Sequence, residues 1–173
     1  MELKALDDSN SPQVKMMIGV LLRFWQIGLI EYDSISKQCR ISIYLKQISE
    51  AEFSELKEKI HSHLKVHSRL TKQDNSALVD IELTNKGELF QIMIKRVVDS
   101  MFRKDITIAT ELITNYLSAE RIFSDEFALF DDLISDDELD SLILDALSDQ
   151  SDLKLRGIRS DGRLAVYPTK AAD

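Results

Sequence analysis

The chain has 173 residues, of which 44% are hydrophobic and 30% charged, and its net charge is -8. Five glycines and two prolines exclude a low-complexity or collagen-like chain. The length suits one globular domain with a substantial core. We therefore expect a single domain over residues 1–173, with flexible ends at 1–11 and 168–173.

The negative charge is concentrated in one part of the chain. Eleven acidic residues and no lysine or arginine lie between Ser124 and Asp152, so removing them from the net -8 leaves +3 for the rest. The sequence thus describes a nearly neutral body that carries an acidic helical segment at 123–149.

Cysteine content and hydropathy favour the cytoplasm. Cys39 is the only cysteine, which excludes an internal disulfide. The first ten residues lack the basic-then-apolar order of a signal peptide. The longest apolar run, Met16 to Ile30, is interrupted by Arg23 and Gln26, so no membrane span is expected. This run suits either the core of the monomer or the interface of a homodimer.

The N-terminal third predicts a helix followed by a hairpin. Ser11-Pro12 is typical of a helix start, and Gly28 is a plausible end for that helix. Alternating apolar and polar residues from Arg40 to Lys46 predict a strand with one wet face, paired with Leu29–Tyr32.

The middle of the chain predicts two more helices around a strand. Ser49 and Glu52 have capping-box spacing and begin a helix that should end near Leu70. The alternation from Ala77 to Thr84 predicts a third strand. Asn85 is then read as the cap of a long central helix, or two consecutive ones, over Glu88–Leu117, where apolar residues recur close to helical spacing.

The C-terminal part predicts a short helix and a hairpin. Ser135 and Glu138 form a second capping-box pattern, and the acids that follow lie in the first turn, where the helix dipole favours them. Asp161-Gly162 suits the turn of a terminal hairpin.

These elements predict an α+β fold. The expected architecture is a small antiparallel sheet, made of a β-hairpin plus one or more strands, packed on several helices in a helix-rich chain. The alternative is a mainly helical protein with one or two hairpins.

Two histidines are the only candidate metal ligands. His63 and His67 are four residues apart on one predicted helix, a spacing that zinc sites use. The sequence places no third ligand beside them, and both positions also continue the apolar stripe of that helix. The more common interpretation is that they edge the apolar face, so we predict no cofactor.

Motifs for nucleotide binding and for hydrolysis are missing. The sequence contains neither GxxxxGK[ST] nor GxGxxG nor GxSxG. Cys39 beside Arg40 is a candidate for a reactive thiol, but no base is placed near it by sequence. An enzyme is therefore less expected than a binding protein.

The acidic amphipathic segment motivates the main functional hypothesis. Apolar residues interleaved with acids suit a helix that lies in a partner's groove while its acids meet a basic rim. We expect a non-catalytic interaction or regulatory protein that binds a protein partner, or a second copy of itself, through this surface. The candidate contact residues are Phe127, Phe130, Asp131, Asp132, Asp136, Asp137 and Asp140. The competing interpretation is that the same stripe covers the protein's own core.

The alternative hypothesis is a nucleic-acid-associated regulator. Lys154, Arg156, Arg159 and Arg163 fall on the predicted terminal hairpin, and Arg23 and Arg40 lie near the first one. Residues 21–45 also resemble the end of a winged-helix domain, in which a helix leads into a two-stranded wing. The 20 residues before this stretch are too few for the helices such a domain needs, and the acidic block would repel nucleic acid.

Overall fold

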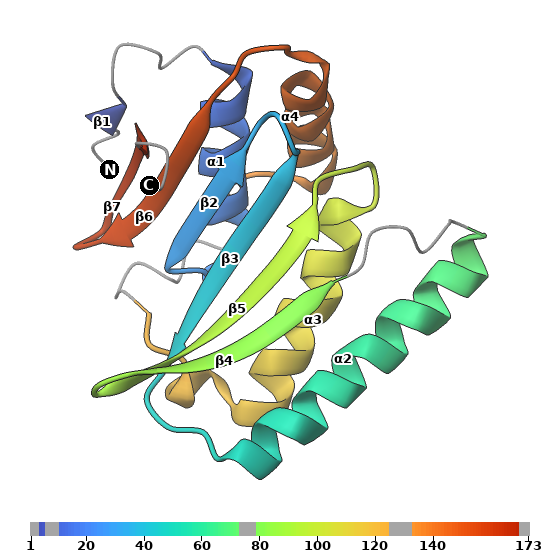
Figure 1. The fold of residues 1–173 in the computed structure, drawn as a ribbon, viewed down its shortest axis with the longest axis vertical. Coiled ribbons are helices and arrows are strands. Elements are labelled where there is room, and N and C mark those ends of the chain that lie inside the picture. The colour runs from blue at the N-terminus through green and yellow to red at the C-terminus, as the bar shows by residue number, and fades with distance from the viewer. Residues whose placement is uncertain (1–3, 6–10, 73–78, 125–132, 170–173) are drawn as a thin grey trace.

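Helices cover one face of a single large sheet (Figure 1). This computed structural model describes residues 4–5, 11–72, 79–124 and 133–169. The helices are α1 (Pro12–Arg23), α2 (Glu50–Thr71), α3 (Phe102–Leu117), the 3-10 turn η1 (Ala119–Arg121) and α4 (Asp136–Ser148). The strands are β1 (Lys4–Ala5), β2 (Leu29–Asp33), β3 (Gln38–Leu45), β4 (Asp80–Lys86), β5 (Leu89–Val97), β6 (Lys154–Ser160) and β7 (Arg163–Pro168).

The seven strands form one sheet in the order β1-β7-β6-β2-β3-β5-β4. All neighbours are antiparallel except β1 and β7, which are parallel. The fold is α+β, but the predicted small sheet is wrong, and so is the alternative of a mainly helical chain with one or two hairpins. The difference arises because three local hairpins join edge to edge, which no local pattern encodes.

The predicted central helix over Glu88–Leu117 is wrong in its first third. Residues Leu89–Val97 form strand β5, which pairs with β3 on one side and β4 on the other, and α3 begins only at Phe102. Apolar residues occupy so many positions of this stretch that strand and helix periods both fit. Asn85 is not a helix cap: its side chain accepts a hydrogen bond from the Gly87 amide in the β4–β5 turn.

Local signals elsewhere predicted the elements correctly. Strands β2 and β3 form the expected hairpin, and β6 and β7 form the terminal one. Asp161 and Gly162 have φ angles of 50° and 72°, as a type I′ turn requires. Helix α1 has Pro12 in its first turn but ends at Arg23 rather than at Gly28. The β2–β3 hairpin is not the two-stranded wing that the winged-helix resemblance implies: it lies inside the seven-stranded sheet, with β6 bonded to β2 and β5 bonded to β3.

Helix α1 belongs to the core of the monomer. Met16, Met17, Val20 and Leu21 are fully buried. The apolar run that begins at Met16 therefore lies inside the monomer, which removes the reason to place it at a dimer interface.

The two faces of the sheet differ in polarity. On one face, side chains such as Ile41, Ile43 and Ile94 are buried beneath the helices. The residues between them, among them Arg40 and Tyr44, point to the other face, which no described helix crosses in Figure 1. This alternation is the usual pattern of an antiparallel sheet that faces water on one side.

Candidate functional site

The acidic helix α4 is packed closely on α1. Its Leu139, Ile143 and Ala146 are buried, and the Ser135 side chain accepts a hydrogen bond from the Glu138 amide at 3.2 Å. A Cβ at Gly19 of α1 would lie 2.9 Å from Leu142, so the two helices approach closely at this glycine. The apolar stripe of α4 therefore covers this protein's own core.

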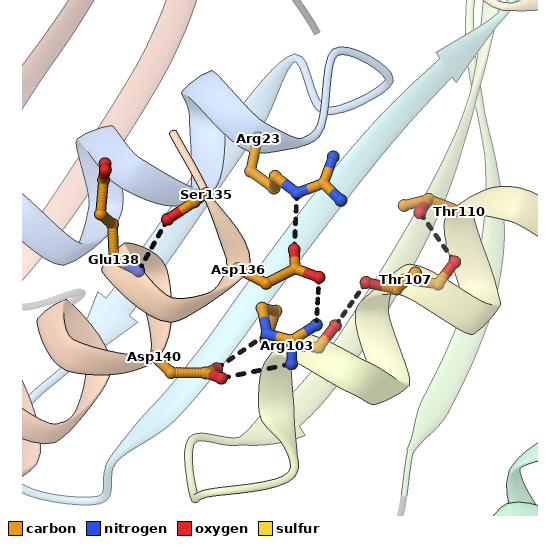
Figure 2. A network of polar contacts seen from close by, with 8 residues as sticks. All are labelled: Arg23, Arg103, Thr107, Thr110, Ser135, Asp136, Glu138 and Asp140. Carbon is orange, nitrogen blue, oxygen red and sulfur yellow. Dashed lines mark hydrogen bonds and ion pairs between the residues drawn. The ribbon is translucent and has the colours of Figure 1, made fainter. Parts of the chain in front are cut away.

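Two of the predicted contact acids are bound by arginines of the same chain (Figure 2). Arg103 of α3 donates to both carboxylate oxygens of Asp140, at 2.8 and 3.2 Å. Its third nitrogen lies 3.3 Å from Asp136, whose other oxygen accepts from Arg23 Nε at 3.0 Å. The bond to Asp140 and the nearby acids raise the pKa of Arg103. The network joins α1, α3 and α4, so Asp136 and Asp140 form ion pairs within the molecule.

The remaining predicted contact residues divide into two groups. Phe127, Phe130, Asp131 and Asp132 lie outside the described residues. Asp137 is exposed on the outer side of α4. Leu144, 56% exposed, belongs to the same helix, and sequence reasoning had not singled it out.

The histidine pair lies on the C-terminal half of α2. His63 Nδ1 is 2.8 Å from the Lys59 carbonyl oxygen, and His67 Nδ1 is 3.8 Å from Asp105 Oδ1. Within the described residues, no group of three His, Cys, Asp or Glu side chains could hold a metal ion. Both rings instead line an apolar groove of about 410 Å³, together with Val66 and other residues of α2 and α3.

The basic residues of the terminal hairpin have partners inside the molecule. Lys154 lies 3.9 Å from Asp33, and Arg156 lies 3.1 Å from Glu31. The Arg159 guanidinium donates to the carbonyl oxygen of Leu21 in the last turn of α1, where a positive charge complements the helix dipole. These contacts weaken the case for a nucleic-acid surface on β6.

Cys39, the candidate reactive thiol, is a core residue of β3. Its side chain is 1% exposed, and burial raises the pKa of its thiol. Burial likewise raises the pKa of the neighbouring Tyr32 to about 12. A thiol that is both buried and protonated is a poor nucleophile, so the structure argues against a catalytic role for this cysteine.

An aromatic groove that sequence reasoning missed lies at one end of the sheet. Its volume is about 690 Å³. The lining residues are Trp25, Ile27, Gly28, Tyr44, Leu89, Phe123, Ser124, Arg159, Ser160 and Asp161. They come from five separate parts of the chain, and no motif spacing connects them. Only the pairing of the strands brings them together.

Backbone contacts hold the aromatic side chains of this groove in place. The Phe123 amide donates to the Tyr44 carbonyl oxygen at 2.8 Å, and Ile122 forms a β-bridge with Leu45. Phe123 therefore lies beside Tyr44, and its side chain is 52% exposed. A Cβ at Gly28 would lie 2.9 Å from the Tyr44 ring, so glycine allows this ring to lie close to the backbone. Burial raises the pKa of the Tyr44 hydroxyl.

Comparison of the chain with models of protein families, with curated proteins and with solved structures found no match in any of the three. Its function must therefore be argued from its own residues. None of the helices within the described ranges has the length and apolar composition needed to cross a lipid bilayer.

Proposed function

We propose that this protein is a non-catalytic interaction protein that binds a segment of a protein partner in the aromatic groove. The observation that supports this most directly is that the half-exposed Phe123 lines one groove with Tyr44, at the end of a sheet face that no described helix covers in Figure 1. Large rigid side chains such as Trp and Tyr contribute much of the energy of protein interfaces.

The composition of the groove suits a peptide with an apolar anchor. Trp25, Leu89 and Phe123 offer apolar surface, while Ser160 and Asp161 supply polar groups at the hairpin turn. Binding sites commonly combine an apolar lining with a few polar groups that fix orientation. We infer that the partner inserts one or two apolar side chains and bonds the polar groups with its backbone.

The outer face of α4 is a second candidate for the same function. Leu144 is 56% exposed and Leu133 is 49% exposed, and the acids Asp137 and Asp145 are exposed with them. Within the described residues, arginines form ion pairs with Asp136 and Asp140 of this helix but not with Asp137 or Asp145. A basic partner with an apolar centre would suit it.

Binding in the groove can be followed by tryptophan fluorescence, because Trp25, the single tryptophan, lines it. We would select peptides from a random library on the immobilised protein and titrate each one while following Trp25 fluorescence. Selected peptides should share an apolar anchor and shift the emission. Phe123→Glu should weaken their binding by about tenfold or more, since it places a charge in an apolar contact.

A matched control is Ile35→Glu, which changes a 67% exposed apolar residue of the β2–β3 turn in the same way. It should leave peptide affinity unchanged. If peptides bind Phe123→Glu as tightly as the intact protein, the groove is not the contact site. Peptides that instead lose binding with Leu144→Glu would move the contact to α4.

The compartment is part of the proposal. We place the protein in the cytoplasm because its only thiol leaves no internal disulfide to form. Fractionation of cells that express the tagged protein would test this.

A further inference from the structure

Helix α2 lies at the margin of the molecule, and much of it is exposed. It has 22 residues, of which only Leu56 and Ile60 are buried. Figure 1 shows it running past the edge strand β4 and away from the sheet. Tyr116 of α3 anchors its first half by donating to Glu55 at 2.7 Å and by placing its ring 4.8 Å from the Lys59 ammonium.

One side of α2 is exposed along most of its length. Residues at spacings of three and four fall on one side of a helix. This set is Glu55, Glu58, Ser62, Lys65, Val66 and Arg69, and all six are exposed. Val66 is 54% exposed and Leu70, one turn further, 78%. Both line the apolar groove with Ile108 of α3. A helix whose only role was to cover the core would not need this apolar rim.

The charges on the exposed side change sign along the helix. Of this set, Glu55 and Glu58 lie in the first half, whereas Lys65 and Arg69 lie in the second half. The exposed Lys59 lies 3.5 Å from Glu55, on the side of the helix that faces Tyr116. The helix dipole favours this order, but its effect fades within the first and last turns. Glu58 and Lys65 are both more than one turn from the helix ends. The dipole therefore does not account for the sign change in the middle of α2.

We propose that two copies of this chain associate through antiparallel α2 helices that cross at Ser62. In this arrangement Glu58 faces the partner's Lys65, and Glu55 faces the partner's Arg69. The two-fold axis repeats each pair, so four opposite-charge pairs surround the crossing. Ser62 is small enough for the helices to approach closely, and Val66 is covered by the partner. This surface is independent of the aromatic groove.

A charge exchange tests the proposal directly. The intact protein should sediment as a dimer at micromolar concentration. Glu55→Lys with Glu58→Lys makes the exposed side wholly basic, and Lys65→Glu with Arg69→Glu makes it wholly acidic. Each double variant should be monomeric, with affinity at least about tenfold weaker. An equimolar mixture of the two variants should form a heterodimer, because each basic helix then faces an acidic one.

The matched control reverses two acids away from α2. Glu88→Lys with Asp152→Lys changes the net charge by the same amount as the first double variant, at exposed positions outside the helix. This variant should remain a dimer. Circular dichroism of every variant checks that the fold is kept.

Cross-linking gives a second readout that does not depend on charge. Ser62→Cys should form a disulfide-linked dimer on mild oxidation, because facing residues at a helix crossing reach disulfide distance. Ser54→Cys lies two turns from the proposed axis and should not, and Cys39 is buried. A monomeric intact protein, a mixture of the double variants that stays monomeric, or equal cross-linking at both positions would each overturn the proposal.

Discussion

Helices α2 and α4 begin in the same way and are used differently. Each has a serine cap with a glutamate at the third helical position, and the serine accepts a bond from that glutamate's amide at 3.1 or 3.2 Å. Helix α4 then buries its stripe on α1, and two of its acids bind Arg103 and Arg23. Helix α2 presents a charged and partly apolar side to solvent.

The comparison shows that capping and amphipathicity specify a helix but not its partner. Close packing at Gly19 draws α4 onto α1 and brings Asp136 within reach of Arg23. The second half of α2 is linked to the rest of the described chain through His67, which lies 3.8 Å from Asp105. The same local chemistry thus produces a closed contact in one helix and an open surface in the other.

The largest effect is expected at the buried ion pair beneath the second half of α2. Arg96 is 3% exposed and donates to Asp105 and Asp99, both at 2.9 Å. Arg96→Met should lower the free energy of unfolding by about 3–5 kcal/mol, because it leaves the Asp105 carboxylate buried without a cation. Urea denaturation measures this. The double variant with Asp105→Asn should recover part of the loss, and a cost below about 1 kcal/mol would contradict the assignment.

A smaller loss in the free energy of unfolding is expected when the contact between α3 and α4 is removed. Arg103→Ala removes two bonds to Asp140 and one contact with Asp136. The cost should be about 1–2 kcal/mol, at the lower end for charged hydrogen bonds, because the carboxylates are nearly half exposed. Asp137→Asn is the control on the same helix and should stay within about 0.5 kcal/mol. Equal effects at Arg103 and Asp137 would show that the network in Figure 2 contributes nothing.

Removing the serine cap of each helix should have a different measurable effect in α2 than in α4. Ser49→Ala and Ser135→Ala each delete a cap worth about 1 kcal/mol. Because α4 is part of the core, Ser135→Ala should lower global stability in thermal unfolding. Ser49→Ala should chiefly increase amide exchange in the first turns of α2. If both variants lower the melting temperature equally and leave local amide exchange unchanged, the proposed difference between α2 and α4 is wrong.

The smallest effect concerns Glu52 at the start of α2. Hydrogen bonds from Arg121 and from the Ser49 amide lower its pKa to about 2. A lowered carboxyl pKa stabilises the fold above the ordinary value near 4.5, and the benefit is lost as pH falls toward 2. Carboxyl carbon shifts in an NMR titration report the pKa. It should rise toward the ordinary value in Arg121→Gln and stay low in the control Arg23→Gln.

Local chemistry was readable from the sequence. The caps at Ser49 and Ser135 and the turn at Asp161-Gly162 involve residues within three positions of one another. Hairpin β2–β3 followed from alternation over a few residues. The acidic block and the single cysteine are also properties of the chain itself.

What only the tertiary structure decided depends on contacts between distant residues. Strand β5 is a strand because β3 and β4 bond it on both sides, which overrides an ambiguous apolar pattern. Asp140 binds an arginine 37 positions away, and Phe123 meets Tyr44 across the end of the sheet. Spacing along the chain encodes none of these contacts, because each arises only when separate elements pack. The sequence therefore determined where several helices and turns begin. Packing decided which charged side chains form ion pairs inside the molecule and which remain on its surface.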